Sequence, residues 1–511
     1  MKVTIAQINP KTLDFEYNFS LIQEKLKETD VDSLIIFPEL SLSGSPLYDS
    51  ISYNDTYKKS IQYADKLSEL KKDFIFGLPI AQNEEILNAL AFIENGELKA
   101  IATKKNLNRF DKGFSSGEGF CTIEYKKQTI AFGFLEDLDD YLKKQDKADL
   151  IICTSNILFT PETQKEVLTS LQPKIRKAKV PIVLANRCGA EGSYIFNGSS
   201  FFMLSNGDLS KELPLFEEST LQIETQKTEK YAISPLSRIE KMYHAAILGI
   251  KDYFRKNNIK KALIGLSGGI DSALVVVLAV EALGKENVIG VLLPSEYSTS
   301  HSITDAKASA ENLGIQHYTI PIKETFTSAL KALLPVFEGK EPNVAEENIQ
   351  SRIRGMILMG IANKIGAALL NTTNKSELSV GYGTLYGDTS GAVGTLGDIF
   401  KTDVWEMSRW INRNKEIIPQ NSIIKPPSAE LRPDQKDTDS LPDYDILDKV
   451  LFLHLEQRLN GDELIAQGFE SAVVDKILRL VKINEWKRHQ AAPPLRMSNS
   501  ALGIEIIMPI S

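Results

Sequence analysis

Residues 261–278 read Lys-Ala-Leu-Ile-Gly-Leu-Ser-Gly-Gly-Ile-Asp-Ser-Ala-Leu-Val-Val-Val-Leu, and this stretch decides the fold of the second half of the chain. Residues 262–266 have strand character, Ser267-Gly268-Gly269 interrupts them, and a long apolar helix is predicted from Asp271. Glycines let a backbone approach a ligand closely, and a helix start offers unpaired N–H groups and a positive dipole end. The stretch therefore predicts a phosphate-binding turn between a strand and a helix.

Three small residues alone also fit a helix whose start merely happens to be rich in Ser and Gly. The turn lacks the Lys of a Walker loop, and its glycine spacing is not that of a dinucleotide fingerprint. Ser267-Gly-Gly-x-Asp271-Ser272 after a strand instead resembles the pyrophosphate loop of the ATP pyrophosphatases, which split ATP into AMP and pyrophosphate. Asp271 adds a hard oxygen ligand suited to Mg²⁺.

The size and composition of the chain set further limits. With 511 residues, two domains are expected. A net charge of −8 argues against a general nucleic-acid or membrane-surface binder, so any phosphate site must be made basic locally. The cysteines at 121, 153 and 188 lack metal-ligand spacing and suit a reducing compartment. No signal segment and no membrane-spanning apolar run is recognised, so a cytoplasmic location is expected.

The first part of the chain alternates predicted strands with helical stretches, which is typical of an α/β sandwich. The predicted strands are residues 3–8, 33–37, 74–79, 89–94, 129–134, 150–154 and 182–186. Three segments resemble motifs of the carbon–nitrogen hydrolase (nitrilase) family: Phe37-Pro-Glu39-Leu-Ser, Thr103-Lys104-Lys-Asn-Leu107 and Asn197-Gly-Ser-Ser200. In that family a cysteine attacks an amide, the Glu takes its proton and the Lys stabilises the oxyanion.

The nucleophile of that chemistry is not found where the resemblance expects it. The family motif Gly-x-x-x-Cys-Glu-Asp corresponds to residues 131–137, and the nucleophile position is Leu135. Leucine has no lone pair to donate. Cys121 and Cys153 are not expected at this strand end. We therefore expect an inactive glutaminase domain in which Glu39 and Lys104 are relics, retained as a buried ion pair.

The boundary between two domains is expected in a polar stretch with an Asn206-Gly-Asp turn signal. We predict a nitrilase-like domain over residues 1–205, a linker over 206–233 and a second domain over 234–511. After the phosphate turn, strands at 288–293 and 317–322 flank a helix at 302–313. This order predicts a parallel sheet with its ligand at the carboxyl edge of the strands.

Six further segments of the second domain resemble NAD⁺ synthetases. They are Asn348-Ile-Gln-Ser-Arg352-Ile-Arg354, residues 369–377, Gly381-Tyr-Gly-Thr-Leu-Tyr-Gly-Asp388, Lys401-Thr402-Asp403, residues 425–431 and residues 485–490. Singly, each also fits a solvated helix start, a turn or a charged helix. Together with the pyrophosphate loop they cover residues 234–511, and with the first domain the resemblance to the two-domain, glutamine-dependent type spans the whole chain.

The resemblance implies a two-step reaction. ATP adenylates the nicotinate carboxylate of deamido-NAD and releases pyrophosphate, and ammonia then displaces AMP. Positioning and electrostatics suffice for this, so no protein nucleophile is needed. Asp271 and Glu377 are expected to hold Mg²⁺. The implied ATP positions are Gly265, Leu266, Ser267, Gly268, Gly269, Ile270, Asp271, Ser272, Thr372, Lys401 and Thr402; the implied deamido-NAD positions are Asn348, Arg352, Glu377, Tyr382, Gly383, Thr384, Leu385, Asp388 and Lys487.

The source of ammonia and the acceptor stay open at this point. With Leu135 in place of the nucleophile we expect use of free ammonia, or of ammonia from a separate partner. The alternatives are glutamine use through a displaced nucleophile, and nicotinate mononucleotide as the acceptor. An amidohydrolase with an ATP-binding appendage conflicts with Leu135, and a non-catalytic scaffold conflicts with the intact second-domain motifs. The resemblance also implies a homodimer through the second domain, with the dinucleotide site across the interface.

Overall fold

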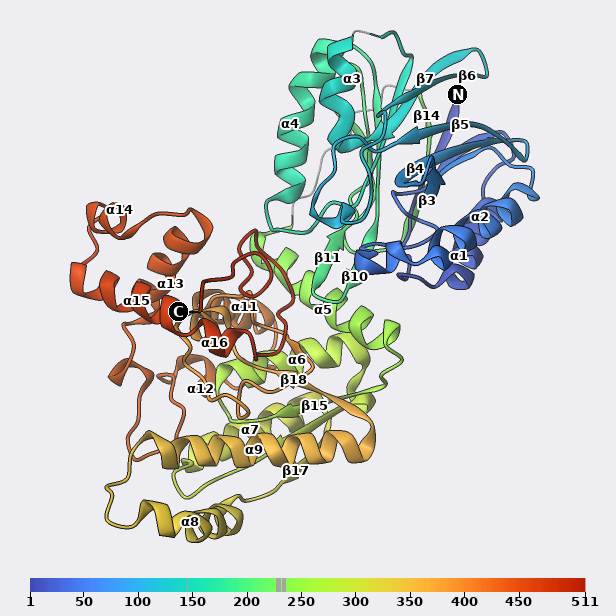
Figure 1. Cartoon of the computed structure of the whole chain (residues 1–511). Coiled ribbons are helices and arrows are strands. Elements are labelled where there is room, and N and C mark those ends of the chain that lie inside the picture. The colour runs from blue at the N-terminus through green and yellow to red at the C-terminus, as the bar shows by residue number, and fades with distance from the viewer. Residues whose placement is uncertain (145, 227–230, 232–235, 511) are drawn as a thin grey trace. The chain divides into compact units, whose positions relative to one another are not determined.

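The computed structural model describes residues 1–144, 146–226, 231 and 236–510. The chain divides into two compact units, Met1–Leu236 and Ser237–Ser511, each described here by itself (Figure 1). The expected α/β fold class, a nitrilase-like sandwich followed by a parallel-sheet domain, is confirmed. None of the helices in the described part of the chain is long and apolar enough to cross a membrane.

The first unit contains two six-stranded sheets. The first has the order β14-β1-β2-β3-β4-β5 and the second β13-β12-β9-β8-β7-β6. The bounds in the first sheet are β1 (Lys2–Gln7), β2 (Ser33–Ile36), β3 (Phe74–Gln82), β4 (Glu85–Glu94), β5 (Glu97–Thr103) and β14 (Ser219–Glu224). Those in the second are β6 (Cys121–Tyr125), β7 (Gln128–Phe134), β8 (Leu150–Ser155), β9 (Ile182–Asn186), β12 (Phe201–Met203) and β13 (Leu209–Glu212), and β10 (Cys188–Glu191) pairs with β11 (Tyr194–Asn197) in a separate hairpin.

Helices cover the outer face of each sheet, which gives four layers (Figure 1). The first sheet carries α1 (Phe15–Glu28) and α2 (Asn54–Ser68), and the second carries α3 (Leu138–Lys144) and α4 (Thr163–Ala178). Alternation along β7 explains how one strand serves two cores, because successive side chains point to opposite faces. Phe132 and Phe134 pack between the sheets, whereas Ala131 packs toward the helices.

The region expected to be a linker, residues 206–233, belongs largely to the first unit. β13 closes one edge of the second sheet and β14 pairs antiparallel with β1, from Lys2 opposite Glu224 to Gln7 opposite Ser219. Both strands are short and mostly polar, so they carry little of the apolar alternation that reveals a strand in a sequence. Residues 227–230, 232 and 233 lie outside the described part of the chain.

The second unit is built on a parallel sheet with the order β17-β16-β15-β18-β19. Its strands are β15 (Lys261–Gly265), β16 (Val288–Leu292), β17 (Gln316–Thr319), β18 (Ala367–Asn371) and β19 (Val393–Gly394). The helices around it are α5 (Arg238–Lys256), α6 (Ile270–Leu283), α7 (Ser300–Leu313), α8 (Lys323–Phe337), α9 (Val344–Ile365), α10 (Lys375–Val380) and α11 (Lys401–Ile411). The third predicted strand ends three residues earlier than expected, at Thr319.

The C-terminal part of this unit is helical. Its elements are α12 (Gln420–Ile424), α13 (Tyr444–Leu451), α14 (Gly461–Ala466), α15 (Ser471–Ile483) and α16 (Glu485–Arg488). An apolar cluster that includes Leu447, Leu464 and Ile477 joins α13, α14 and α15 to Leu378 and Val380 of α10. Because α10 follows the C-terminal end of β18, this packing fixes the position of a helix at the carboxyl edge of the sheet.

Candidate active site

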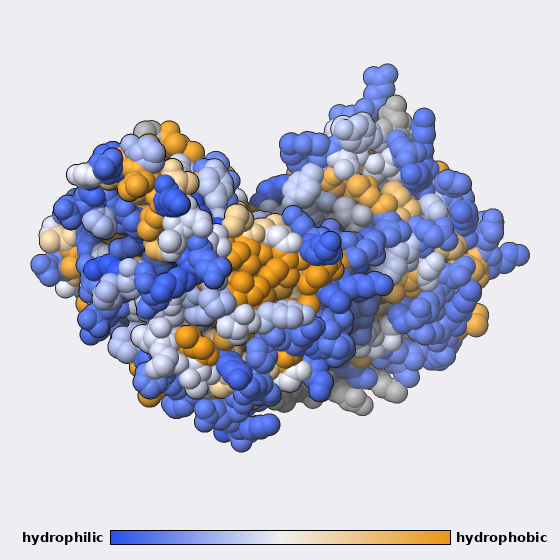
Figure 2. Space-filling model, turned by 90° about the horizontal axis from the view of Figure 1, so that it is seen from below, coloured by the Kyte–Doolittle hydropathy of each residue, from blue (hydrophilic) through white to orange (hydrophobic). Residues whose placement is uncertain are grey.

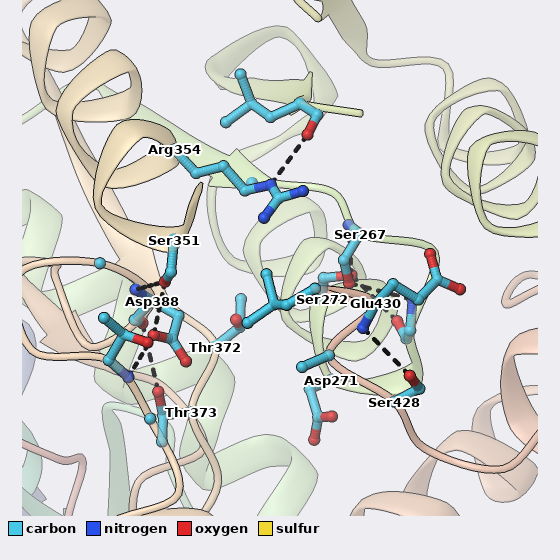
Figure 3. Close-up of a pocket in the computed structure, with 18 of the residues that line it drawn as sticks. Ser267, Asp271, Ser272, Ser351, Arg354, Thr372, Thr373, Asp388, Ser428 and Glu430 are labelled. Atoms are coloured by element: carbon cyan, nitrogen blue, oxygen red, sulfur yellow. Dashed lines mark hydrogen bonds between the residues drawn. The ribbon is translucent and has the colours of Figure 1, made fainter. Parts of the chain in front are cut away.

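A cavity of about 470 Å³ lies at the carboxyl ends of β15, β16 and β18, the edge at which a ligand is expected in a parallel sheet. Most residues implied by the resemblance line it. Those proposed for ATP are Gly265, Leu266, Ser267, Gly269, Ile270, Asp271, Ser272, Thr372 and Lys401; those proposed for the dinucleotide are Asn348, Glu377, Tyr382, Gly383, Thr384, Asp388 and Lys487. In Figure 3, Ser267 and Ser272 lie on one side of this cavity, and Ser351 and Asp388 lie on the other.

The turn after β15 is held by short-range hydrogen bonds. The backbone N–H of Gly269 donates to Ser267 Oγ at 3.2 Å, and the Ser272 hydroxyl donates to the Gly269 carbonyl at 3.1 Å. Gly269 caps α6 without any side-chain hydrogen bond. The first-turn N–H groups of α6 are therefore free to meet an anion at the cavity wall.

Gly268 shapes this turn without lining the cavity. Its φ is +80°, and a Cβ at this position would lie 2.2 Å from the carbonyl oxygen of Ser302. The Ser422 hydroxyl also donates to the Gly268 carbonyl at 3.0 Å. Only glycine fits this close approach, because both the left-handed backbone and the missing side chain are required.

A buried lysine sits between two acidic side chains at the cavity floor. The Lys401 ammonium forms an ion pair with the Asp271 carboxylate, and its Nζ lies 3.6 Å from Glu377 Oε1. Asn374 Nδ2 donates to Asp271 Oδ1 at 3.0 Å. Burial lowers the pKa of Lys401, but the two carboxylates raise it by more, so the lysine stays charged. Burial and the charge of Asp271 raise the pKa of Glu377 well above its usual value.

Asp437 adds a third carboxyl group near Lys401. It accepts hydrogen bonds from the Tyr444 hydroxyl at 2.9 Å and the Tyr382 hydroxyl at 3.1 Å. Burial raises the pKa of Asp437, and the Lys401 charge lowers it. Among the described residues, no group of three or more His, Cys, Asp or Glu side chains could hold a metal ion. Two carboxylates at one site still fit Mg²⁺, which binds through one or two carboxylates together with substrate phosphates.

The opposite wall is formed by the loop that follows α10. Asp388 Oδ1 accepts from the Thr384 N–H at 2.7 Å and from the Ser351 hydroxyl of α9 at 2.9 Å. The Thr384 hydroxyl donates to Asn348 Oδ1 at 2.8 Å. Lys487 Nζ donates to two loop carbonyls, those of Gly381 at 2.8 Å and Gly383 at 3.0 Å. Lys487 therefore lines the cavity while it holds the backbone of this loop.

The two arginines that stand two residues apart on α9 point in different directions. Arg354 lines the cavity and donates from Nε to the Leu293 carbonyl at 3.0 Å. Arg352, the residue named from the sequence, is exposed and donates to the Leu385 carbonyl at 3.2 Å. Residues two apart on a helix point to different sides, so only one of them can reach the cavity. Arg352 therefore does not line this cavity, and its expected contact with the dinucleotide stays a prediction.

Two other expected positions also lie outside the cavity wall. Leu385 is buried in the loop. The Thr402 backbone N–H donates to Asp448 Oδ2 at 2.8 Å. Residues without an expected role also line the cavity, among them Ser351, Arg354, Ser428, Glu430 and Asp437. Their segments had been quoted or lay nearby, but no spacing rule distinguishes their side chains from those of their neighbours.

The first unit contains a second lysine–carboxylate cluster. Lys104 Nζ lies 2.8 Å from Glu39 Oε1, 3.0 Å from Asp111 Oδ2 and 3.1 Å from Glu136 Oε1. Asn88 Nδ2 donates to Glu39 Oε1 at 2.7 Å. Burial, opposed by the charge of Lys104, raises the pKa of Glu39 to about 8. Glu39 and Lys104 are thus in direct contact, together with Asp111 and Glu136, to which no role was assigned from the sequence.

Leu135 lies directly after the C-terminal end of β7, between Phe134 and Glu136. The Phe134 ring centroid is 5.6 Å from Lys104 Nζ, and Glu136 contacts the same lysine. Leu135 packs against the apolar cluster beneath α3 and α4. Cys153 is fully buried in that cluster, in the middle of β8 opposite Gly133. Burial raises the pKa of its thiol.

Comparisons with known proteins cover the whole chain. A family model described as NAD synthase matches residues 242–491. The chain is 36% identical to the glutamine-dependent NAD⁺ synthetase of Thermotoga maritima and 38% identical to that of Synechocystis, in each case over 100% of this chain and 98% of the relative. The solved glutamine-dependent NAD⁺ synthetase of Acinetobacter baumannii, in complex with ADP, has a TM-score of 0.80 at 31% identity and covers 100% of this chain and 98% of that one. The chain therefore belongs to the family of two-domain, glutamine-dependent NAD⁺ synthetases, ligases that use ATP as a co-substrate and carry a first domain of the nitrilase fold.

Proposed function

We propose that this NAD⁺ synthetase amidates deamido-NAD with free ammonia, and that its first domain does not release ammonia from glutamine. A nicotinate carboxylate oxygen attacks the α-phosphorus of ATP, and pyrophosphate leaves. Ammonia then attacks the carboxyl carbon of the adenylate, and AMP leaves with the bonding electrons while a proton is lost from nitrogen. The observation that carries the proposal is Leu135, which stands at the strand end where the nucleophile belongs.

The adenine nucleotide is assigned to the turn after β15. Free N–H groups at the start of α6 suit its phosphates, and the related A. baumannii enzyme was solved with ADP. Arg354 and Lys425 also line this cavity and supply positive charge in a chain whose net charge is −8. These residues can hold two polyanionic substrates together, which is the main requirement of a reaction that proceeds by positioning and electrostatics.

Mg²⁺ is assigned to Asp271 and Glu377. Carboxylate oxygens are the ligands that this ion prefers, and nucleotide phosphates complete its shell. The ion neutralises charge on the phosphates and on the pyrophosphate that leaves. These two carboxylates and Asn374 lie at the start of α6 and the start of α10.

The surroundings of Lys104 support the proposed loss of glutaminase chemistry. The lysine and Glu39 remain in contact, but the side chain between Phe134 and Glu136 is apolar and joins the outer core. Cys153 faces that same outer core from the middle of β8, on the opposite side of the sheet from Phe134. It therefore does not take the place of a strand-end thiol. The printed names of the relatives record glutamine use for those proteins.

A homodimer through the second unit is supported by an exposed apolar face on α8 and α9. Val336 of α8 is 63% exposed, and Val344 and Met356 of α9 are 63% and 59% exposed. Opposite positions of α9, such as Ile353, pack into the core, so this helix is apolar on both sides. Figure 2 views the molecule from below, toward the side on which α8 and α9 lie in Figure 1. It shows an apolar area on this face.

The interface is tested by replacing Met356 and Met359 together by Glu. This double variant should convert a dimer to monomers in sedimentation velocity, whereas an unchanged sedimentation coefficient would contradict this interface.

The acceptor is tested by product analysis with Mg-ATP and ammonium. With deamido-NAD we expect NAD⁺, AMP and pyrophosphate in equal amounts. Nicotinate mononucleotide should be converted at a much lower kcat/KM. A preference for the mononucleotide would overturn the acceptor, and formation of ADP in place of AMP would overturn the adenylate.

A further inference from the structure

The Lys401 ammonium stands where the assigned metal ion would bind. We propose that Lys401 is the resident cation of this site, and that a divalent ion enters only with a nucleotide, whose phosphates then receive the ammonium. This rests on the proposed assignment of Mg²⁺ to Asp271 and Glu377.

The contacts of Lys401 leave little room for a second cation. Its ammonium forms an ion pair with Asp271 Oδ2 and lies 3.6 Å from Glu377 Oε1. The other oxygen of Asp271 accepts a hydrogen bond from Asn374. Both Asp271 oxygens are therefore engaged before any metal arrives. A metal ion on Asp271 Oδ2 has to replace the ammonium.

Two features of its surroundings disfavour the positive charge of Lys401. It is the first residue of α11, where the helix dipole disfavours a positive charge. Its side chain is 2% exposed, so water does not compensate. Three carboxyl groups, those of Asp271, Glu377 and Asp437, supply the opposing charge. The ammonium thus depends on a nearby anion and cannot leave without finding another one.

A divalent ion and the ammonium cannot share the two carboxylates, because like charges at contact distance repel strongly in a buried site. Lys401 also lines the cavity that contains the phosphate-binding turn. Phosphates bound at the start of α6 would offer the ammonium a new partner next to its present one. When the ammonium moves from the carboxylates to the phosphates and the metal ion takes its place, every charge stays paired, both without and with nucleotide. This exchange predicts that the nucleotide and the metal bind cooperatively.

The test measures binding of Mn²⁺, a spectroscopic stand-in for Mg²⁺, to the full-length protein at pH 8 by electron paramagnetic resonance of the free ion. Without nucleotide, wild type should bind Mn²⁺ weakly. Lys401→Met and Lys401→Gln should each bind it at least about tenfold more tightly, because the competing charge is gone. Lys401→Arg should behave like wild type. Lys425→Met is the matched control, since Lys425 also lines the cavity and pairs with a carboxylate, Glu430 at 3.4 Å.

The second arm repeats the titration with α,β-methylene ATP, which cannot be cleaved to pyrophosphate. The analogue should raise the Mn²⁺ affinity of wild type more than that of Lys401→Met, and Asp271→Asn should abolish the increase. Equal Mn²⁺ affinities of wild type, Lys401→Met and Lys401→Gln without nucleotide would overturn the exchange. If Asp271→Asn still abolishes the increase with nucleotide, the metal assignment remains intact. An increase that survives Asp271→Asn would overturn the metal assignment and the exchange together.

Discussion

Two buried lysines in this chain have nearly the same surroundings and different consequences. Lys104 contacts Glu39, Asp111 and Glu136 in the first unit, and Lys401 contacts Asp271 and Glu377 in the second. Lys401 lines a cavity of about 470 Å³ beside a helix start with free N–H groups. The strand end beside Lys104 carries Leu135, which has no reactive group. Under the proposed function, a buried charge cluster does not by itself identify a working site, because it can persist for the stability of the fold.

The largest expected effect distinguishes the two clusters when one carboxyl group in each is replaced by its amide. Asp271→Asn should lower kcat/KM for ammonia-driven NAD⁺ formation by about 10³-fold, since it removes a group assigned to the reacting phosphates. Glu39→Gln should change the same rate by less than about twofold, because the two clusters belong to separate compact units and share no partner. Steady-state kinetics of both variants checks this contrast. A comparable loss in Glu39→Gln would mean that the first cluster takes part in the reaction.

The second prediction concerns stability. Lys104→Met leaves the buried carboxyl groups of Glu39 and Asp111 without their cation, and it should lower the free energy of unfolding of the first unit by about 3–5 kcal/mol. Urea denaturation followed by circular dichroism measures this loss. Adding Glu39→Gln to Lys104→Met should restore part of it, because the amide replaces one of the ionisable carboxyl groups that the lysine contacted. A double variant that is less stable than Lys104→Met would contradict the ion-pair role.

The third prediction is a pH dependence of the first unit. The pKa of Glu39 is raised from 4.5 to about 8 in the folded state, so between these values the native state holds a proton that the unfolded chain has released. The contribution of Glu39 to the free energy of unfolding is therefore full below about pH 4.5. It falls as pH rises to 8, by up to about 1.4 kcal/mol per pH unit. Urea denaturation of wild type between pH 6 and 8 should show this decline, and Glu39→Gln should flatten it. An equal slope in both proteins would assign the decline to another group.

The smallest expected effect is that of the cysteines. Replacing Cys121, Cys153 and Cys188 by Ser or Ala should change the ammonium-driven rate by less than about twofold, because none is assigned to the reaction. The glutamine-driven rate should be at background before and after. A glutamine-driven rate that the replacements abolish would identify a displaced nucleophile and restore function to the first cluster.

Local sequence patterns predicted the framework of both units. The stretch from Lys261 to Leu278 carries its own strand, turn and helix, and the parallel sheet followed from the order of elements. That Arg354 lines the cavity and Arg352 does not could not be predicted, because the two differ only in the direction that each side chain takes from α9. Asp437 was missed because tertiary packing alone brings it to Lys401. β14 was missed because a short edge strand with polar residues has no strong alternation.

The central claim is that this synthetase takes its nitrogen from ammonia in solution. The most direct measurement supplies ¹⁵N-ammonium together with unlabelled glutamine and records the mass of the NAD⁺ formed from deamido-NAD and Mg-ATP. We predict that every product molecule carries ¹⁵N, and that glutamine alone, freed of contaminating ammonia, yields no product. Unlabelled NAD⁺ in proportion to glutamine would contradict the account and show that the first unit still releases ammonia.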